Sequence, residues 1–230
     1  MPTALITGAS RGLGRAAAQA LARRGWSLIV DARRADDLAG AMRGLADVVA
    51  VPGDVTDPRH RADLAAAAGR AGGLDVLVNT ASRLGPSPQP LLRDYPLDEL
   101  GRVYESNVVA PLALIQLLAA PLAAAAGTIV NVSSDAAVEA YPGWGGYGSA
   151  KAALDQLTAV LAAEEPSLHC YAFDPGDMRT DMHQQAFPGE DISDRPEPET
   201  VIPALLRLID ERPPSGRYRA SDLAAPAVTP

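Results

Sequence analysis

Tyr147 and Lys151 give the chain its clearest chemical signal, because a phenol and an ammonium lie four residues apart. They fall at the start of a helical pattern over residues 147–163, where positions i and i+4 share one helix face. An ammonium beside a phenol favours the phenolate and lowers the tyrosine pKa from its usual value of about 10. Ser134, thirteen residues before Tyr147, lies at the C-terminal end of the strand-like segment 128–133 and could hold a substrate oxygen. Together they predict proton exchange with a carbonyl or alcohol oxygen, although each alone fits an ordinary structural residue.

A glycine-rich turn near the N-terminus predicts a site for a dinucleotide phosphate. Strand-like residues 4–7 run into Gly8, Gly12 and Gly14, and a helical pattern over residues 15–24 follows at once. Glycines allow a tight turn and close approach to a ligand, and a helix N-terminus offers unpaired N–H groups at the positive end of its dipole. A plain tight connection is the competing explanation.

The end of the second strand-like segment, residues 27–31, bears on the choice of cofactor. In dinucleotide-binding folds this strand end meets the adenosine ribose. A carboxylate there accepts from the 2′-hydroxyl of NAD, whereas an arginine suits the 2′-phosphate of NADP. Asp31 and Arg33 are two residues apart on a strand, so they should point to the same side. These two residues alone leave both cofactors open.

The elements that must position these groups alternate between strand and helix. Strand-like segments cover residues 4–7, 27–31, 48–51, 74–79, 128–133 and 168–173. Helical patterns cover residues 15–24, 38–45, 59–71, 97–120, 147–163 and 199–211. This order predicts an α/β fold with a Rossmann-type, doubly wound parallel sheet of about seven strands and helices on both faces, in three layers. No linker or repeat divides residues 1–230, so we expect a single domain.

Two stretches are predicted as loops. Residues 82–96 contain several prolines, and residues 182–198 are rich in proline and acidic residues. Loops of this length are uncommon unless they have a function, so residues 180–198 are the candidate substrate loop. Residues 224–230 are predicted as a frayed tail.

Composition and charge exclude several classes of function. The formal net charge of −8 disfavours nucleic acid as a partner. His60, His169 and His183 are scattered without metal-ligand spacing, so no metal is expected. Cys170 is the single cysteine and the first residues lack an export signal, so we expect a cytoplasmic protein. The apolar stretch 111–126 is short and proline-interrupted, which predicts a buried helix and no membrane span.

These motifs, in their order and spacing, resemble the short-chain dehydrogenase/reductase family in its compact single-domain branch, over about residues 3–180. The matching residues are Thr7, Gly8, Gly12 and Gly14 of the cofactor turn, Asp54 and Val55 beside the adenine, Asn107, Ser134, Tyr147 and Lys151 of the active site, and Pro175, Gly176 and Thr180 beside the nicotinamide.

The resemblance implies hydride transfer between a nicotinamide cofactor and a carbonyl or alcohol substrate. Tyr147 would be the proton donor or acceptor, and Lys151 would hold the nicotinamide ribose and depress the Tyr147 pKa. Ser134 would orient the substrate oxygen, and Asn107 would position a water that relays protons. The predicted cofactor-binding residues are Gly8, Ser10, Arg11, Gly12, Leu13, Gly14, Arg33, Asp54, Val55, Asn79, Ala81, Tyr147, Lys151, Pro175, Gly176, Met178 and Thr180.

The resemblance favours NADP(H) and leaves NAD(H) possible. The acid that selects NAD in this family would fall at Ala32, one position after Asp31. Arg33 and Arg11 match the arginines of its NADP-dependent members. The cofactor expectation is therefore NADP(H) before NAD(H).

One departure from the family lies after the fourth strand-like segment. The usual Asn-Asn-Ala-Gly is Asn79-Thr80-Ala81-Ser82 here. Loss of the glycine at Ser82 removes backbone freedom beside the ribose. We expect an altered loop and weaker cofactor binding.

The substrate and the assembly are specified only in outline. Apolar side chains such as Tyr141, Trp144 and Met182 favour a hydrophobic ketone or secondary alcohol. Helical segments 97–120 and 147–163 are apolar on more than one face, which predicts a homodimer or homotetramer. Two alternatives stay open: an NAD(P)(H)-binding sensor with little catalysis, and another doubly wound enzyme such as a methyltransferase, which needs no Tyr-x3-Lys pair.

Overall fold

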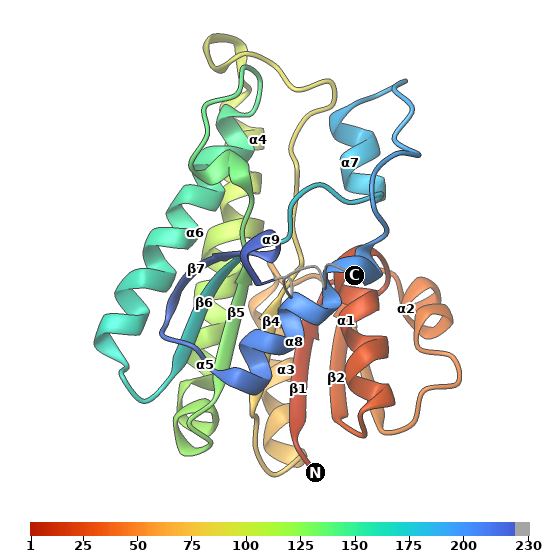
Figure 1. Cartoon of the computed structure of the whole chain (residues 1–230), viewed down its shortest axis with the longest axis vertical. Coiled ribbons are helices and arrows are strands. Elements are labelled where there is room, and N and C mark those ends of the chain that lie inside the picture. Colours follow the sequence, from red (N-terminus) through yellow and green to blue (C-terminus); the bar gives the residue numbers. More distant parts are fainter. Residues whose placement is uncertain (224–230) are drawn as a thin grey trace, which may run out of the picture.

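The computed structural model describes residues 1–223, and Figure 1 shows one sheet flanked by helices. Seven parallel strands follow the order β3-β2-β1-β4-β5-β6-β7. The chain moves outward from β1 to β3 and then returns beside β1 with β4, so the sheet is doubly wound. The predicted Rossmann-type fold is confirmed. The predicted tail, residues 224–230, lies outside the described residues.

The central strands are buried on both faces, which accounts for their nearly continuous apolar sequences. The sequence pattern does not predict β7, because this short strand at the edge of the sheet has the polar sequence Gly-Arg-Tyr-Arg instead of an apolar run. The strands are β1 Thr3–Thr7, β2 Ser27–Ala32, β3 Val48–Pro52, β4 Val76–Asn79, β5 Thr128–Val132, β6 His169–Asp174 and β7 Gly216–Arg219.

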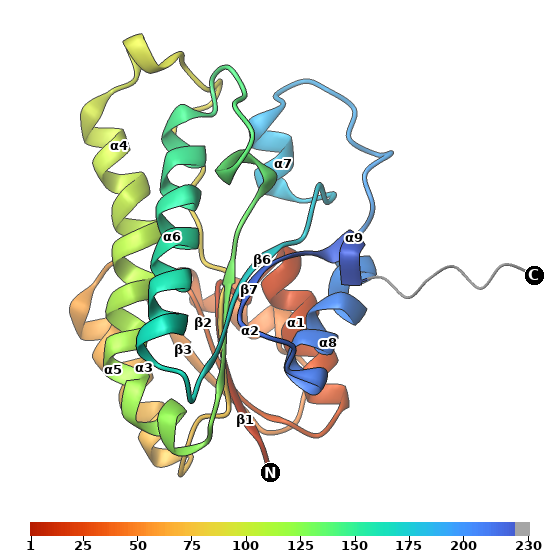
Figure 2. The ribbon, with the colours of Figure 1, turned by 60° about the vertical axis from the view of Figure 1, so that its left-hand side comes forward.

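Helices cover both faces of the sheet, and Figure 2 separates the two groups. One core cluster packs α1, α2 and α8 on one face, and a second packs α3 and α5 on the other. Neighbouring strand residues such as Leu5 and Ile6 belong to different clusters because successive side chains alternate between faces. The helices are α1 Gly12–Arg23, α2 Ala35–Ala41, α3 Pro58–Arg70, α4 Leu97–Tyr104, α5 Ala110–Ala124, α6 Gly145–Glu164, α7 Asp181–Ala186, α8 Ile202–Glu211 and α9 Ala220–Leu223.

The predicted helix 97–120 is one continuous helix, Leu97–Ala124, with a wider turn in its middle. Residues Glu105–Val109 form a π-helical turn between α4 and α5, which a hydrophobic pattern does not reveal. An 18-residue window of this helix has a mean hydropathy of 1.8, so by length and composition it could cross a membrane. The helix packs against α3 and α6, and 39% of this window is buried, so the prediction of a buried helix holds for only part of it.

The second predicted loop is wrong in its first part. Residues Asp181–Ala186 form α7, and the Thr180 hydroxyl caps this helix by accepting from the His183 N–H at 3.2 Å. Six residues are too few to show a helical period in the sequence, which explains the error. The first predicted loop holds, except for the short 3-10 turn Leu92–Asp94.

Candidate functional site

A cleft of about 990 Å³ opens where the carboxyl ends of the strands meet. The residues that follow β1, β2, β3, β4, β5 and β6 all line it, together with α7. The structure brings Ser134, Tyr147 and Lys151 to this cleft. Every predicted cofactor-binding residue except Asn79 lines it as well, whereas Asn107 lies outside its walls.

The glycine turn forms a narrow cradle at one part of the cleft. Gly8 and Gly12 have φ values of 67° and 54°, which side chains rarely tolerate. A Cβ atom on Gly14 would lie 2.5 Å from both the Gly8 carbonyl oxygen and the Thr80 hydroxyl. Helix α1 starts inside this turn without a side-chain cap on its N-terminus. Its free N–H groups and small residues fit a pyrophosphate.

The segment that contains Thr80 and Ser82, where the chain departs from the usual family motif, is hydrogen-bonded to the residue before the glycine turn. The Thr7 hydroxyl accepts from the backbone N–H groups of Thr80 and Ala81, each at 3.1 Å. The Thr80 hydroxyl donates to the Thr7 carbonyl. Ser82 has no positive φ, so the missing glycine causes no backbone strain there. The loop is therefore held by its own side chains, and the expected loss of cofactor affinity stays a prediction.

Asp31 lies at the end of β2 but does not present a free carboxylate to the ribose position. It is 1% exposed, and one oxygen accepts from the Gly8 N–H at 2.7 Å. The other oxygen lies 3.0 Å from His60 Nε2. Burial raises the pKa of Asp31, and its hydrogen bonds to His60 and Gly8 oppose this rise. Asp31 and Arg33 both line the cleft, and the carboxylate of Asp31 holds the glycine turn in place.

The three arginines near this strand end have different environments. Arg34 pairs with Asp37 at 2.9 Å, and Arg11 pairs with Asp181 of α7, also at 2.9 Å. Arg33 is exposed on the cleft wall and forms no ion pair within residues 1–223. Among the three, Arg33 is the one with a guanidinium available to an anionic ligand.

Tyr147 and Lys151 are both buried in the first turns of α6, at 8% and 2% exposure. The Lys151 ammonium donates to the Val132 carbonyl at 2.6 Å and lies 5.5 Å from the centre of the Tyr147 ring. Gly148 allows this placement, because a Cβ atom there would lie 2.5 Å from the Ala136 carbonyl oxygen. Ser134 caps the turn Asp135–Ala137 by accepting from the Ala136 N–H at 3.2 Å. The helix and this turn therefore hold the three groups on one wall.

The pKa values of Tyr147 and Lys151 on this wall differ from the expectation based on the sequence. Burial raises the pKa of Tyr147, a hydrogen bond from Ser82 opposes this, and the charges of Asp174 and Asp135 add to the rise. Burial also lowers the pKa of Lys151 to about 8, with Asp155 opposing. The expected depression of the Tyr147 pKa is therefore wrong for this structure, since desolvation dominates. A neutral phenol at neutral pH is a proton donor.

Asn79 and Asn107 direct their amides into the protein. Asn79 Nδ2 donates to Asn131 Oδ1 at 2.8 Å inside the sheet. Asn107 sits on the π-helical turn, where its Oδ1 accepts from the Arg83 N–H at 2.8 Å and its Nδ2 donates to the Arg83 carbonyl at 2.9 Å. Both side chains shape the segments beside the cleft.

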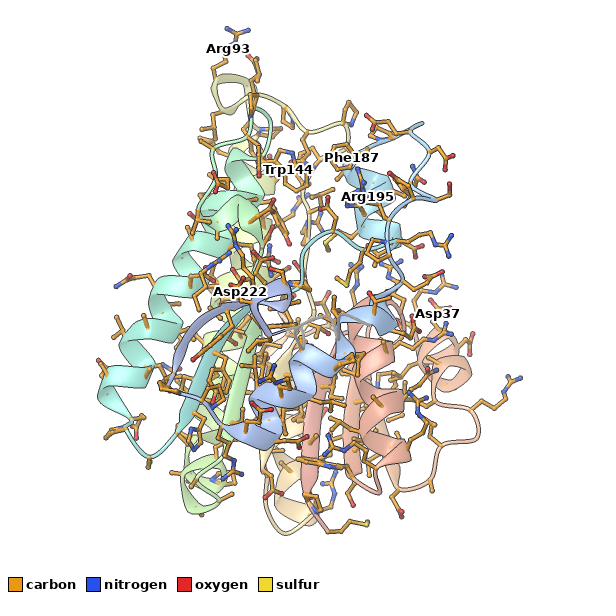
Figure 3. All side chains as sticks on the ribbon, in the orientation of Figure 1. Asp37, Arg93, Trp144, Phe187, Arg195 and Asp222 are labelled. Atoms are coloured by element: carbon orange, nitrogen blue, oxygen red, sulfur yellow. The ribbon has the colours of Figure 1, made fainter. Side chains whose placement is uncertain are left out.

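Aromatic and apolar groups form the wall beyond Tyr147. Figure 3 shows Trp144 at the start of α6 beside Phe187 at the end of α7. Their ring centres are 5.9 Å apart, and Trp144 also meets the Tyr147 ring edge-on at 5.8 Å. Leu84 and Met182 pack into the same cluster. This end of the cleft suits an apolar ligand.

Comparisons with known proteins agree with this geometry. A family model described as short chain dehydrogenase matches residues 2–191. The chain belongs to this family. Sepiapterin reductase of Mus musculus is 35% identical over 202 residues, which cover 79% of this chain and 76% of the relative. Benzil reductase of Bacillus subtilis is 31% identical over 185 residues, which cover 77% and 75%. A short chain dehydrogenase of Shigella flexneri, solved in complex with NADP, has a TM-score of 0.87 and 27% identity, over 96% of this chain and 97% of that chain.

The structure of this short chain dehydrogenase also shows contacts beside the cleft that the sequence patterns do not indicate. His60 of α3 supports Asp31, and its ring fills the space beside Gly53, where a Cβ atom would overlap it. Arg83 ties its segment to Asn107 and also pairs with Glu99 of α4 at 2.9 Å. Neither belongs to a short motif, so only the fold reveals these contacts.

Proposed function

We propose that this short chain dehydrogenase is an NADP(H)-dependent oxidoreductase that moves a hydride between the nicotinamide and a carbonyl or secondary alcohol. The carrying observation is that Tyr147, Lys151 and Ser134 line the same cleft as the glycine cradle. Two relatives are named as reductases, which supports the same reaction class. The sensor alternative lacks such support, since a sensor needs no buried proton donor.

The cofactor would supply the hydride when bound, and the chain supplies the binding and proton groups. The free N–H groups at the start of α1 would hold the pyrophosphate, and Asp54 and Val55 would contact the adenine. Pro175, Gly176 and Thr180 would flank the nicotinamide. All of these residues lie on the one cleft.

In the direction of carbonyl reduction, the active-site wall would supply the proton. Tyr147 is a neutral phenol that can donate its proton to the substrate oxygen as negative charge develops there. Ser134 would hold that oxygen, and Trp144 would exclude water from the apolar side of the substrate. Lys151 would bind the ribose and stabilise the phenolate left on Tyr147.

The preference for NADP(H) rests on Arg33. Replacing Arg33 by alanine should weaken NADPH binding by roughly 10- to 100-fold, because a charge-assisted contact to the 2′-phosphate is lost. NADH affinity should change by less than about threefold. Arg34→Ala is the matched control, since Arg34 already pairs with Asp37. Fluorescence titration measures both affinities, and equal effects of Arg33→Ala on NADPH and NADH would contradict the assignment.

Residues 180–198 are proposed to cover the substrate. Thr180, Met182 and His183 line the cleft from this segment, while Glu190 is exposed. NADPH together with a bound ketone should slow backbone hydrogen exchange across the segment, and exchange in α5 should stay unchanged. Exchange in residues 180–198 that is identical with and without ligands would rule out a covering loop.

The first test of the function is NADPH consumption on a panel of ketones that includes benzil. Turnover that depends on the carbonyl substrate supports the proposal. Tight NADPH binding without turnover on any substrate would instead favour the sensor alternative.

The assembly and the location of the protein are proposed from the surface and the sequence. Val109, Leu117 and Val160 are exposed apolar residues on the outer helices, which fits a homodimer or homotetramer. A cytoplasmic location remains the expectation from the sequence.

A further inference from the structure

Arg217 of β7 lies behind the active site, outside the segment that the family model matches. Its Nε donates to Asp155 Oδ2 at 3.0 Å. Its Nη2 donates to the Ser134 carbonyl at 2.9 Å and to Asp174 Oδ2 at 2.8 Å. The side chain is only 24% exposed. One guanidinium therefore holds three groups from three different elements.

Each of these three groups belongs to a segment that carries or supports residues of the proposed active site. Ser134 follows β5 and lines the cleft. Asp155 lies one helical turn after Lys151 on α6, and so fixes the helix that carries both Tyr147 and Lys151. Asp174 ends β6, and its Oδ1 accepts from the Gly176 N–H at 3.0 Å, which fixes the turn beside the nicotinamide position.

The charges around Arg217 also face the reacting groups. The Asp155 and Asp174 side chains are 15% and 3% exposed, so both carboxylates depend on a partner for stability. Asp155 faces Lys151, while Asp174 and Asp135 face Tyr147. Arg219 reaches Asp174 only at 3.8 Å. Arg217 is thus the close counter-charge for both buried carboxylates.

We propose that Arg217 is a positioning residue for the reaction, which locks the Ser134 segment, α6 and the Pro175–Gly176 turn into one frame. A planar guanidinium can donate in three directions at fixed angles, whereas a lysine ammonium is a single point charge on a flexible stem. The proposal rests on the proposed function, because its effect is on hydride transfer. The competing explanation is a purely structural contact that stabilises the fold and leaves the reaction untouched.

The test compares Arg217→Met and Arg217→Lys with the wild-type protein. Arg207→Met is the matched control, since Arg207 of α8 also joins a carboxylate, Glu211, to a backbone carbonyl, that of Leu223, away from the cleft. The measurements are thermal unfolding, NADPH affinity, and kcat and KM for ketone reduction across pH. Both Arg217 variants should lose roughly 10- to 100-fold in kcat, with NADPH affinity within about threefold, because displacing reacting groups by about 1 Å has an effect of this order.

The pH dependence of kcat distinguishes a positioning role of Arg217 from an effect of its positive charge. In Arg217→Met, Asp155 loses its guanidinium partner, so its negative charge should raise the pKa of Lys151 and move any fall of kcat that follows Lys151 deprotonation to higher pH. In Arg217→Lys the charge stays, so the profile should keep its wild-type position while kcat still falls. If Arg217→Met does not fold, Arg217→Lys alone decides the question through its kcat.

Three results would overturn the proposal. A folded Arg217 variant with kcat within about twofold of the wild type would show a purely structural contact. A loss equal to that of Arg207→Met would show a general effect of stability. A wild-type protein that binds NADPH but reduces no ketone would refute the proposed function, and the role of Arg217 with it.

Discussion

Replacing Tyr147 by phenylalanine should lower kcat/KM for ketone reduction by roughly 10²- to 10⁴-fold, the range that a positioned general acid contributes. The phenol is buried against Trp144 and Ser82, and burial raises its pKa further above neutral pH. Phenylalanine preserves the ring packing and removes only the proton that the substrate oxygen would receive. NADPH affinity and the melting temperature should therefore stay close to those of the wild type.

The control for this prediction is Tyr141→Phe. Tyr141 is exposed, and its hydroxyl donates to Asp135 at 3.0 Å, next to the same turn but not at the reacting position. Its loss should reduce kcat/KM by less than about threefold. A Tyr147→Phe variant that retains more than a tenth of the wild-type turnover would require another proton donor.

Replacing Lys151 by methionine should lower kcat by roughly 10²- to 10³-fold, as expected when one preorganised charge is removed from an active site. The same variant should unfold at an equal or higher temperature at pH 7. Burial lowers the pKa of Lys151 from 10.5 to about 8, so keeping the ammonium in the fold costs of the order of 3 kcal/mol below pH 8. Methionine removes this cost and also the hydrogen bond to Val132.

The difference in stability between the wild type and Lys151→Met should depend on pH. The folded protein releases the Lys151 proton near pH 8, and the unfolded chain releases it near pH 10.5. Between these values the cost of burying the charge disappears, so the wild type should gain stability relative to Lys151→Met as pH rises. Urea unfolding at several pH values measures the difference. A Lys151→Met protein that is less stable by several kcal/mol at pH 7 would contradict the assigned pKa.

The fold and most of the cleft follow from local patterns. The alternation of apolar strands and helical patterns predicts the doubly wound sheet, and the spacing of Gly8, Gly12 and Gly14 predicts the phosphate cradle, where Gly8 and Gly12 have positive φ. Strand β7 escapes such reasoning because it is an edge strand with a polar sequence, and α7 escapes because it is too short for a period. The four-residue spacing of Tyr147 and Lys151 predicts that they lie close together, because both belong to one helix.

The electrostatics of the site could not be predicted from sequence, because they depend on depth in the fold. An i, i+4 pair places Lys151 near Tyr147, but desolvation of both groups determines the direction of their pKa values. The same holds for Asp31, whose position on β2 suggests a ribose contact while the structure turns it toward Gly8 and His60. Arg217 is also invisible in the sequence, as its three partners lie far apart along the chain.

The most direct test of the proposed function follows the hydride itself. NADPH deuterated at the transferring position of the nicotinamide is incubated with the protein and a ketone that it consumes, and the alcohol product is analysed by mass spectrometry. We expect one deuterium on the carbinol carbon with the wild type and almost no product with Tyr147→Phe. An alcohol without deuterium, or no product from any ketone despite bound NADPH, would contradict hydride transfer as the function of this cleft.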